Sequence, residues 1–121
     1  MANEITLNLK MSVVKTYLDH EENPGTIPVN MTGSNAAGGS QSITTTAAAI
    51  GVGSVTTAGY SYFRNLGPTN YLEIGTGAGT NFVAFMKLKA GEAAIARLGT
   101  NAPTAKANTA TVDLQYYILS D

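Results

Sequence analysis

The chain has 121 residues, a length that predicts one domain with its own core and argues against a second full domain. Only 12% of the residues are charged, about half the usual share, so the surface favours contact with other protein and a homo-oligomer is expected. The net charge of −1, with scattered Lys and Arg, argues against nucleic acid as a partner, and the lack of cysteine excludes disulfides and thiolate chemistry.

The first 42 residues predict two strands and then an arm. Residues 4–14 alternate apolar and polar side chains, which is typical of a half-buried strand. The apolar positions are Ile5, Leu7, Leu9, Met11 and Val13. DHEENPG, starting at Asp19, predicts a polar turn, and TIPVNM after it predicts a short edge strand, because Pro28 cannot donate a ladder hydrogen bond. TGSNAAGGSQS, around residues 32–42, predicts a flexible loop or arm.

This predicted arm is expected to reach across a subunit boundary. Ordering each residue costs on the order of 1 kcal/mol in backbone entropy, and burial of alanine returns little of it. Main-chain hydrogen bonds to a neighbour's sheet edge would order the arm, because strand addition depends on backbone more than on large side chains. Deleting Asn35 to Ser40 is therefore expected to weaken oligomerisation and leave the melting temperature of the domain unchanged.

The middle of the chain is less regular than its second half. ITTTAAAI, from Ile43, has β-branched ends around an alanine centre, so strand and helix compete there; its neighbours favour a strand. GVGSVTTAG after it predicts a short strand and a turn. From Tyr60 onward, five alternating runs predict an antiparallel meander, with a tight hairpin at Gly91. The runs are YSYFRNL, NYLEIG, NFVAFMKL, EAAIARL and ATVDLQYYIL.

These elements define the expected fold. The predicted core positions are Leu72, Ile74, Phe82, Ala84, Met86, Leu88, Leu98, Val112, Leu114, Tyr116 and Ile118. About eight to ten short strands without a helix predict an all-β fold, an antiparallel β-sandwich that is jelly-roll-like. This single sandwich domain is expected to cover residues 1–121.

The run GTGAG, with Gly75, Gly77 and Gly79, raises the question of a phosphate-binding loop. Dinucleotide and P-loop motifs need other glycine spacings and a following helix, whose N-terminus supplies amides and dipole to the phosphate. The residues after GTGAG alternate as a strand does. The glycines are therefore interpreted as positive-φ residues of a hairpin loop, and no cofactor is predicted.

Candidate catalytic and metal-ligating groups are few. The cluster DHEE, from Asp19, is interpreted as a solvated turn, because consecutive residues rarely converge on one ion and no second cluster completes a shell. No metal site is predicted. His20 is the only histidine, no serine lies in a GxSxG elbow, and nothing indicates that Glu73 and Glu92 pair. We expect no catalytic residues and no enzymatic activity.

Aromatic residues offer a further candidate site. Tyrosines on strand-like runs could stack on a sugar or a single-stranded base, although core and interface roles are commoner. Alternation puts Tyr60 and Tyr62 on one face and Phe63 on the other, and Arg64 is a candidate interface anchor or a partner for Glu73. The predicted interface residues are Tyr60, Tyr62, Arg64, Tyr71 and Tyr117.

Three stretches of the second half recur in a fixed order in one known family: GYSYFRNLGPTNYLEIG, FMKLKAGEAAIARL and AKANTATVDLQYYILSD. Through them the chain resembles a family of small virion structural proteins encoded by tailed bacteriophages. The resemblance covers residues 59–121, and GSQSI near residues 39–43 adds weakly to it. Gly67-Pro68 is a departure, because the family usually has a less rigid pair there.

The resemblance implies a noncatalytic β-sandwich in the virion, made in the host cytoplasm. The implied role is a capsid decoration or cement protein that stabilises the capsid, with the major capsid protein as partner. A tail, neck or fibre position, with tail proteins as partners, stays open. So does a carbohydrate-binding adsorption module, with a small glycan hydrolase as the weakest alternative. MANEITLNLK is not a signal peptide and no apolar stretch would span a bilayer, so no membrane partner is expected.

Overall fold

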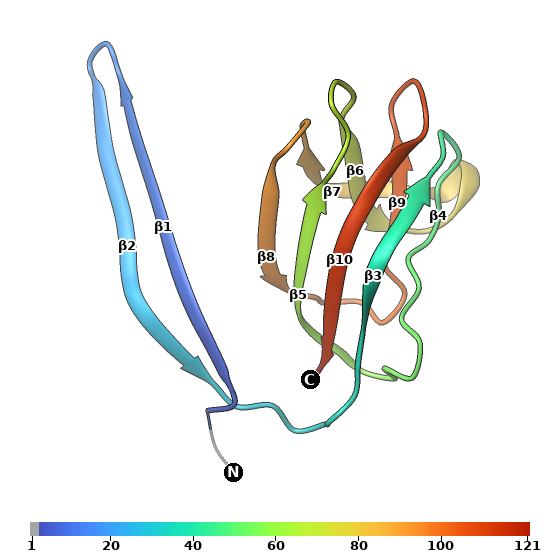
Figure 1. The fold of residues 1–121 in the computed structure, drawn as a ribbon, viewed down its shortest axis with the longest axis horizontal. Helices are drawn as coiled ribbons and strands as arrows, with labels where there is room; N and C mark the ends of the chain where they lie inside the picture. Colours follow the sequence, from blue (N-terminus) through green and yellow to red (C-terminus); the bar gives the residue numbers. More distant parts are fainter. Residues whose placement is uncertain (1–2) are drawn as a thin grey trace. The chain divides into compact units, whose positions relative to one another are not determined.

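A computed structural model describes residues 3–121 and divides the chain into two compact units, Met1–Thr32 and Gly33–Asp121. The first unit is a two-stranded β-hairpin and the second holds two four-stranded sheets (Figure 1). The sequence predicted one sandwich domain over residues 1–121. That boundary stays a prediction; the strands of the first unit pair with each other and join neither sheet of the second.

The hairpin unit consists of β1 (Ile5–Lys15) and β2 (Leu18–Val29), paired antiparallel along their length. Thr16 has a φ of 52°, the positive value that a two-residue hairpin turn requires. The prediction of a polar turn at DHEENPG was wrong, because these residues lie within β2. The turn signal instead marks an irregularity in the strand pair. The register shifts between Leu9 and Met11, where Asn23 and Pro24 lie opposite the single residue Lys10, and a bulge tolerates a proline without an N–H.

The second unit is an antiparallel β-sandwich with the strand order of a jelly roll. Its strands are β3 (Ala36–Ile43), β4 (Ala48–Ala49), β5 (Ala58–Asn65), β6 (Leu72–Thr76), β7 (Val83–Leu88), β8 (Ala93–Arg97), β9 (Thr104–Ala107) and β10 (Val112–Ser120). One sheet has the order β3-β10-β5-β8 and the other β4-β9-β6-β7 (Figure 1). Consecutive strands often lie in opposite sheets, as two interlocked Greek keys require. The predicted all-β sandwich is confirmed.

The core of the sandwich lies between its two sheets. Seven predicted core residues are buried: Leu72, Ile74, Leu88, Leu98, Val112, Leu114 and Ile118. Met86 and Tyr116 are partly buried against them. Ala84 is exposed and Phe82 is half-exposed, against the prediction. A register shift between β6 and β7 places Ala84 opposite Gly75, and an extra residue in a strand moves every following side chain to the other face.

The prediction of a loop or arm around residues 32–42 was wrong for the part from Ala36 onward. This stretch is β3, which pairs with β10 from Ala36↔Leu119 to Val112↔Ile43. A weakly apolar sequence becomes a strand here because β10 supplies main-chain partners. Gly38 is also required by packing, since a Cβ there would lie 2.3 Å from Cδ1 of Tyr117.

Two further expectations about the strands differ from the structure, and one strand lies outside the predicted runs. Gly91, with φ of 80°, does turn the chain, but β7 and β8 lie in different sheets, so its turn is a crossover and not a hairpin. ITTTAAAI forms only the end of β3 and the two-residue β4, and residues 50–57 contain no strand. TAKA forms β9, although two of its four residues are polar.

Candidate interaction surfaces

Four of the five predicted interface residues lie together on the outer face of the sheet β3-β10-β5-β8. Tyr60, Tyr62 and Arg64 alternate along β5 with the buried Ser61, Phe63 and Asn65, so they point outward. Tyr117 lies on the adjacent strand β10, directly opposite Tyr62. We call Tyr60, Tyr62, Arg64 and Tyr117 the tyrosine face. The alternation predicted from the sequence, with Phe63 inward, is confirmed.

Neighbouring strands hold the rings of the tyrosine face in place. The guanidinium of Arg97 lies 4.7 Å from the ring centroid of Tyr60, a cation–π contact, and also forms an ion pair with Asp121. The ring of Tyr117 lies over Gly38, where no side chain competes for the space. Ile95 on β8 pairs with Tyr62 on its other side. The tyrosines are therefore partly ordered by their own sheet before any partner arrives.

The tyrosine face is open to solvent and hollowed. Tyr117 is 51% exposed, and so are Leu66, which follows β5, and Ile95, which lies on β8 opposite Tyr62. A shallow cavity of about 400 Å³ lies between Tyr62, Leu66, Tyr117 and the Gly39-Ser40 segment of β3. Exposed aromatic and aliphatic side chains around a depression are typical of sites that bind protein or a flat ligand.

Tyr71, the fifth predicted interface residue, lies elsewhere. It precedes β6 in the other sheet, and the Nζ of Lys87 lies 4.1 Å from its ring centroid. Glu73 belongs to that same sheet, where it is opposite Lys87 and Lys106. The suggested pairing of Arg64 with Glu73 is therefore not made, because the two residues lie on strands of different sheets.

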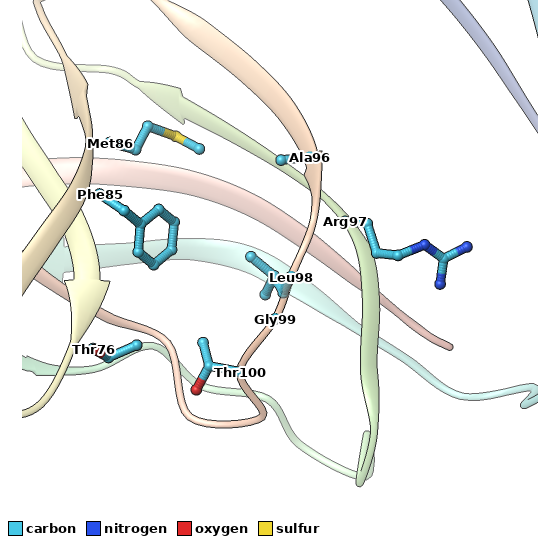
Figure 2. Close-up of a pocket in the computed structure, with 8 residues that line it drawn as sticks. All are labelled: Thr76, Phe85, Met86, Ala96, Arg97, Leu98, Gly99 and Thr100. Atoms are coloured by element: carbon cyan, nitrogen blue, oxygen red, sulfur yellow. The ribbon is translucent and has the colours of Figure 1, made fainter.

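A second cavity opens at one side of the sandwich, between the edge strands β7 and β8. Its volume is about 510 Å³, and Phe85, Met86 and Leu98 form its apolar lining together with the methyl-bearing Thr76 and Thr100. Figure 2 shows these side chains around the opening, with the guanidinium of Arg97 directed away from it. The cavity exists because β7 and β8 do not pair, so nothing closes the two sheets there. We call it the edge cavity.

The hairpin unit presents an apolar row that sequence analysis expected to be half-buried. Ile5, Leu7, Leu9, Met11 and Val13 share one face of β1, which we call the hairpin face. Leu7 is buried at 6% exposure and Ile5 and Val13 are half-buried, whereas Leu9 and Met11 are 36% and 62% exposed. The predicted alternation is confirmed, but Leu9 and Met11 are exposed where a half-buried strand was expected.

The GTGAG run connects β6 to β7 through a short 3₁₀ turn, Gly79–Asn81. Gly77 and Gly79 have φ values of 80° and 57°, so the prediction of positive-φ glycines is confirmed for both. Gly75 belongs to β6 and serves close packing, since a Cβ there would lie 2.0 Å from the carbonyl oxygen of Val83. A phosphate loop needs a longer helix after the glycines, and here β7 follows.

The ionisable cluster on β2 is exposed, as predicted, but it belongs to a strand and not a turn. His20 and Glu22 lie on one face, joined by a contact of 2.7 Å between Nε2 and Oε1. Asp19 and Glu21 point to the other face, where Glu21 lies 3.3 Å from Lys10. A strand directs consecutive side chains apart, so the four cannot surround one ion. Within residues 3–121, no group of three or more His, Asp or Glu residues could hold a metal.

The RNL segment has a structural role that sequence analysis missed. Asn65 is fully buried at the end of β5. Its Nδ2 donates hydrogen bonds to the carbonyl oxygens of Asn70 and Leu88, at 2.9 and 3.0 Å. Its Oδ1 accepts one from the N–H of Gly67 at 2.7 Å. The main-chain carbonyl of Asn65 also accepts from Gly91, so one residue joins the RNL, TNY and KAGE segments.

This arrangement explains in physical terms why those three segments occur in one chain. A buried amide must find partners for its two donors and its acceptor. Here Gly67 and Asn70 of the β5–β6 connection supply two of them, and Leu88 at the end of β7 supplies the third. The signal available in the sequence was an asparagine at an inward-facing strand position, which is costly unless its side chain is fully hydrogen-bonded.

Comparison of the chain with models of protein families, with curated proteins and with solved structures found no match. Over the residues that the structure describes, no helix is long and apolar enough to cross a membrane.

Proposed function

We propose that this protein is a noncatalytic structural subunit of a tailed-phage virion, a decoration or cement protein that binds the capsid and stabilises it. The observation that carries the proposal is the tyrosine face, on which Tyr60, Tyr62, Arg64 and Tyr117 gather on one open side of a rigid sheet. Tyrosine and arginine are enriched where protein contacts contribute most binding energy. The resemblance of residues 59–121 to phage virion proteins supports the same role.

The mechanism proposed is adhesion. Pre-ordered rings lose little conformational entropy on binding, because Tyr60 is already held by Arg97 and Tyr117 already lies over Gly38. The weakly charged surface of the chain reduces the cost of desolvation on contact. Modest contacts repeated by the symmetry of a particle give strong overall attachment.

Add-back to particles that lack this protein tests the proposal. Wild type and a Tyr117→Ser variant are titrated onto such particles, and the bound copies are counted by quantitative mass spectrometry. Loss of a central aromatic anchor is expected to weaken attachment about 10-fold or more. Location of the chain by cryo-EM on the same particles distinguishes the capsid from the tail, neck or fibre.

Tyr71→Ser is the matched control, because it removes the same side chain from the other sheet. It is expected to change attachment by less than about 3-fold, and calorimetry of both variants checks that the sandwich still melts as the wild type does. Equal losses of attachment for Tyr117→Ser and Tyr71→Ser would show that the tyrosine face does not mediate attachment. Absence of the protein from purified particles would overturn the virion role itself.

The cavity on the tyrosine face favours one second candidate, a carbohydrate-binding adsorption module. Tyr62 and Tyr117 line a depression of about 400 Å³ together with Gln115, a residue able to hydrogen-bond hydroxyl groups. Stacking of sugar rings on tyrosine would then replace contact with protein. A glycan array decides between the two: binding that Tyr62→Ser abolishes would favour the adsorption role, and an array without signal would count against it.

A further inference from the structure

The hairpin face is an apolar row on an element of marginal stability, and Glu22 and His20 of β2 lie opposite Met11 and Val13. A two-stranded hairpin is marginal in water unless a third strand or another layer covers one side. Leu9 and Met11 are 36% and 62% exposed, and Leu18, at the start of β2, is also exposed. The apolar row therefore requires a covering surface. β1 and β2 each also have one main-chain edge that pairs with no strand.

The same chain carries a surface of matching chemistry. The edge cavity is lined by Phe85, Met86 and Leu98, and Val83 on β7 adds further exposed apolar area beside it. Its volume of about 510 Å³ gives room to side chains from a partner. Methionine is flexible and makes favourable contacts with aromatic rings, so Met11 suits a cavity that contains Phe85.

Formal charge favours the pairing of one unit with the other. The hairpin unit has four carboxylates and two lysines, a charge of −2, with its histidine neutral. The sandwich unit has five Lys or Arg and four carboxylates, a charge of +1. Opposite net charges assist encounter between a hairpin and a sandwich, whereas two hairpins repel each other.

We propose that the hairpin face of one copy binds the edge cavity of a second copy, with Met11 inserted beside Phe85 and Leu98. The inference rests on the proposed function, in that it names a second copy of this chain as the partner of an assembly subunit. Each copy both gives a hairpin and receives one, so the contact is made twice in a closed dimer or repeats around a ring.

Thiol cross-linking between copies tests the proposal directly. The chain has no cysteine, so Met11→Cys and Thr100→Cys each introduce one thiol, the second at the rim of the edge cavity. The two variants are mixed, one of them tagged for mass, and treated with a short bismaleimide. A product that contains both variants joins two copies by necessity. We expect the yield of this product to be at least 5-fold higher than that of a control pair in which Val14→Cys replaces Met11→Cys.

Val14→Cys mixed with Thr100→Cys is the control, because Val14 is exposed on the opposite face of the same hairpin. Circular dichroism and light scattering of each variant confirm that fold and association match the wild type. Equal yields for Met11→Cys and Val14→Cys would overturn the docking, whether the protein is a dimer through another surface or a monomer.

Repeating the reaction in purified particles separates this inference from the proposed function. Cross-linking of Met11→Cys to a different virion protein, and not to Thr100→Cys, would overturn the second copy as occupant and leave the virion role intact. The expected product in solution, together with absence of the chain from particles, would support the docking and remove the virion role.

Discussion

Both units of this chain consist of β-strands, but they differ in how many of their side chains are buried. In the sandwich, strands of 4 to 9 residues, with one shorter exception, bury Phe63, Leu114 and Ile118 completely. In the hairpin, strands of 11 and 12 residues bury only Leu7. The difference shows that alternation and a turn suffice to form a strand pair, whereas burial requires a second layer.

Deleting Asn35 to Ser40 should have the largest effect on the stability of the sandwich, because it removes more than half of β3 and its pairing with β10. The sandwich is expected to lose cooperative unfolding or to melt at a much lower temperature, measured by calorimetry. The earlier arm interpretation predicts an unchanged melting temperature, so an unchanged value would contradict the strand assignment.

The same substitution in each unit measures the difference in burial. Leu114→Ala, at 0% exposure, should lower the free energy of unfolding by about 2–5 kcal/mol, because it removes core contacts and leaves a cavity. Leu18→Ala, at 56% exposure in the hairpin, should change it by less than about 0.5 kcal/mol. Urea denaturation of dilute protein measures both, and similar losses would show that the hairpin face is covered within one chain.

Asn65→Ala tests whether a buried, hydrogen-bonded amide contributes to the free energy of unfolding of the sandwich as an apolar core residue does. It leaves the carbonyls of Asn70 and Leu88 and the N–H of Gly67 without their partner, at a cost of about 2–3 kcal/mol. Asn81→Ala, on the exposed 3₁₀ turn, is the control and should cost less than about 0.5 kcal/mol. Equal melting temperatures for the two variants would refute the role given to Asn65.

The smallest expected effect concerns the GTGAG loop of the sandwich. ATP, GTP and NAD should produce no binding heat in titration calorimetry, because β7 and not an α-helix follows the glycines. Gly79→Ala serves as a reference variant. A Cβ at this position would meet no neighbouring atom, but the positive φ of Gly79 would strain an alanine and so disturb the loop backbone. Micromolar affinity for any of the three nucleotides, lost in that variant, would restore the phosphate-loop interpretation.

Much of the sandwich could be predicted where local pattern and tertiary environment agree. The outward tyrosines and the inward Phe63 of β5 follow from alternation, as do the buried Leu114 and Ile118 of β10. Prediction failed where the environment decides. β3 has glycines and small polar residues but finds partners on β10, and the bulge in β7 exposes Ala84.

The candidate sites divide in the same way. The sequence placed Tyr60, Tyr62 and Arg64 on one strand face, but only the sheet order brings Tyr117 beside them and leaves Tyr71 on the other sheet. The edge cavity could not be predicted, because it depends on β7 and β8 lying in different sheets despite the tight turn between them.

The sequence by itself determined the all-β class, the alternation of the main strands and the positive-φ turns at Gly77 and Gly91, because these depend on local sterics and on the two-residue period of a strand. Only the tertiary structure decided that residues 5–29 form a separate hairpin, that Ala36–Ile43 is a strand and that Asn65 is buried. Those outcomes depend on partners distant in the sequence, since a main-chain edge or a buried amide is satisfied only by what the fold brings to it.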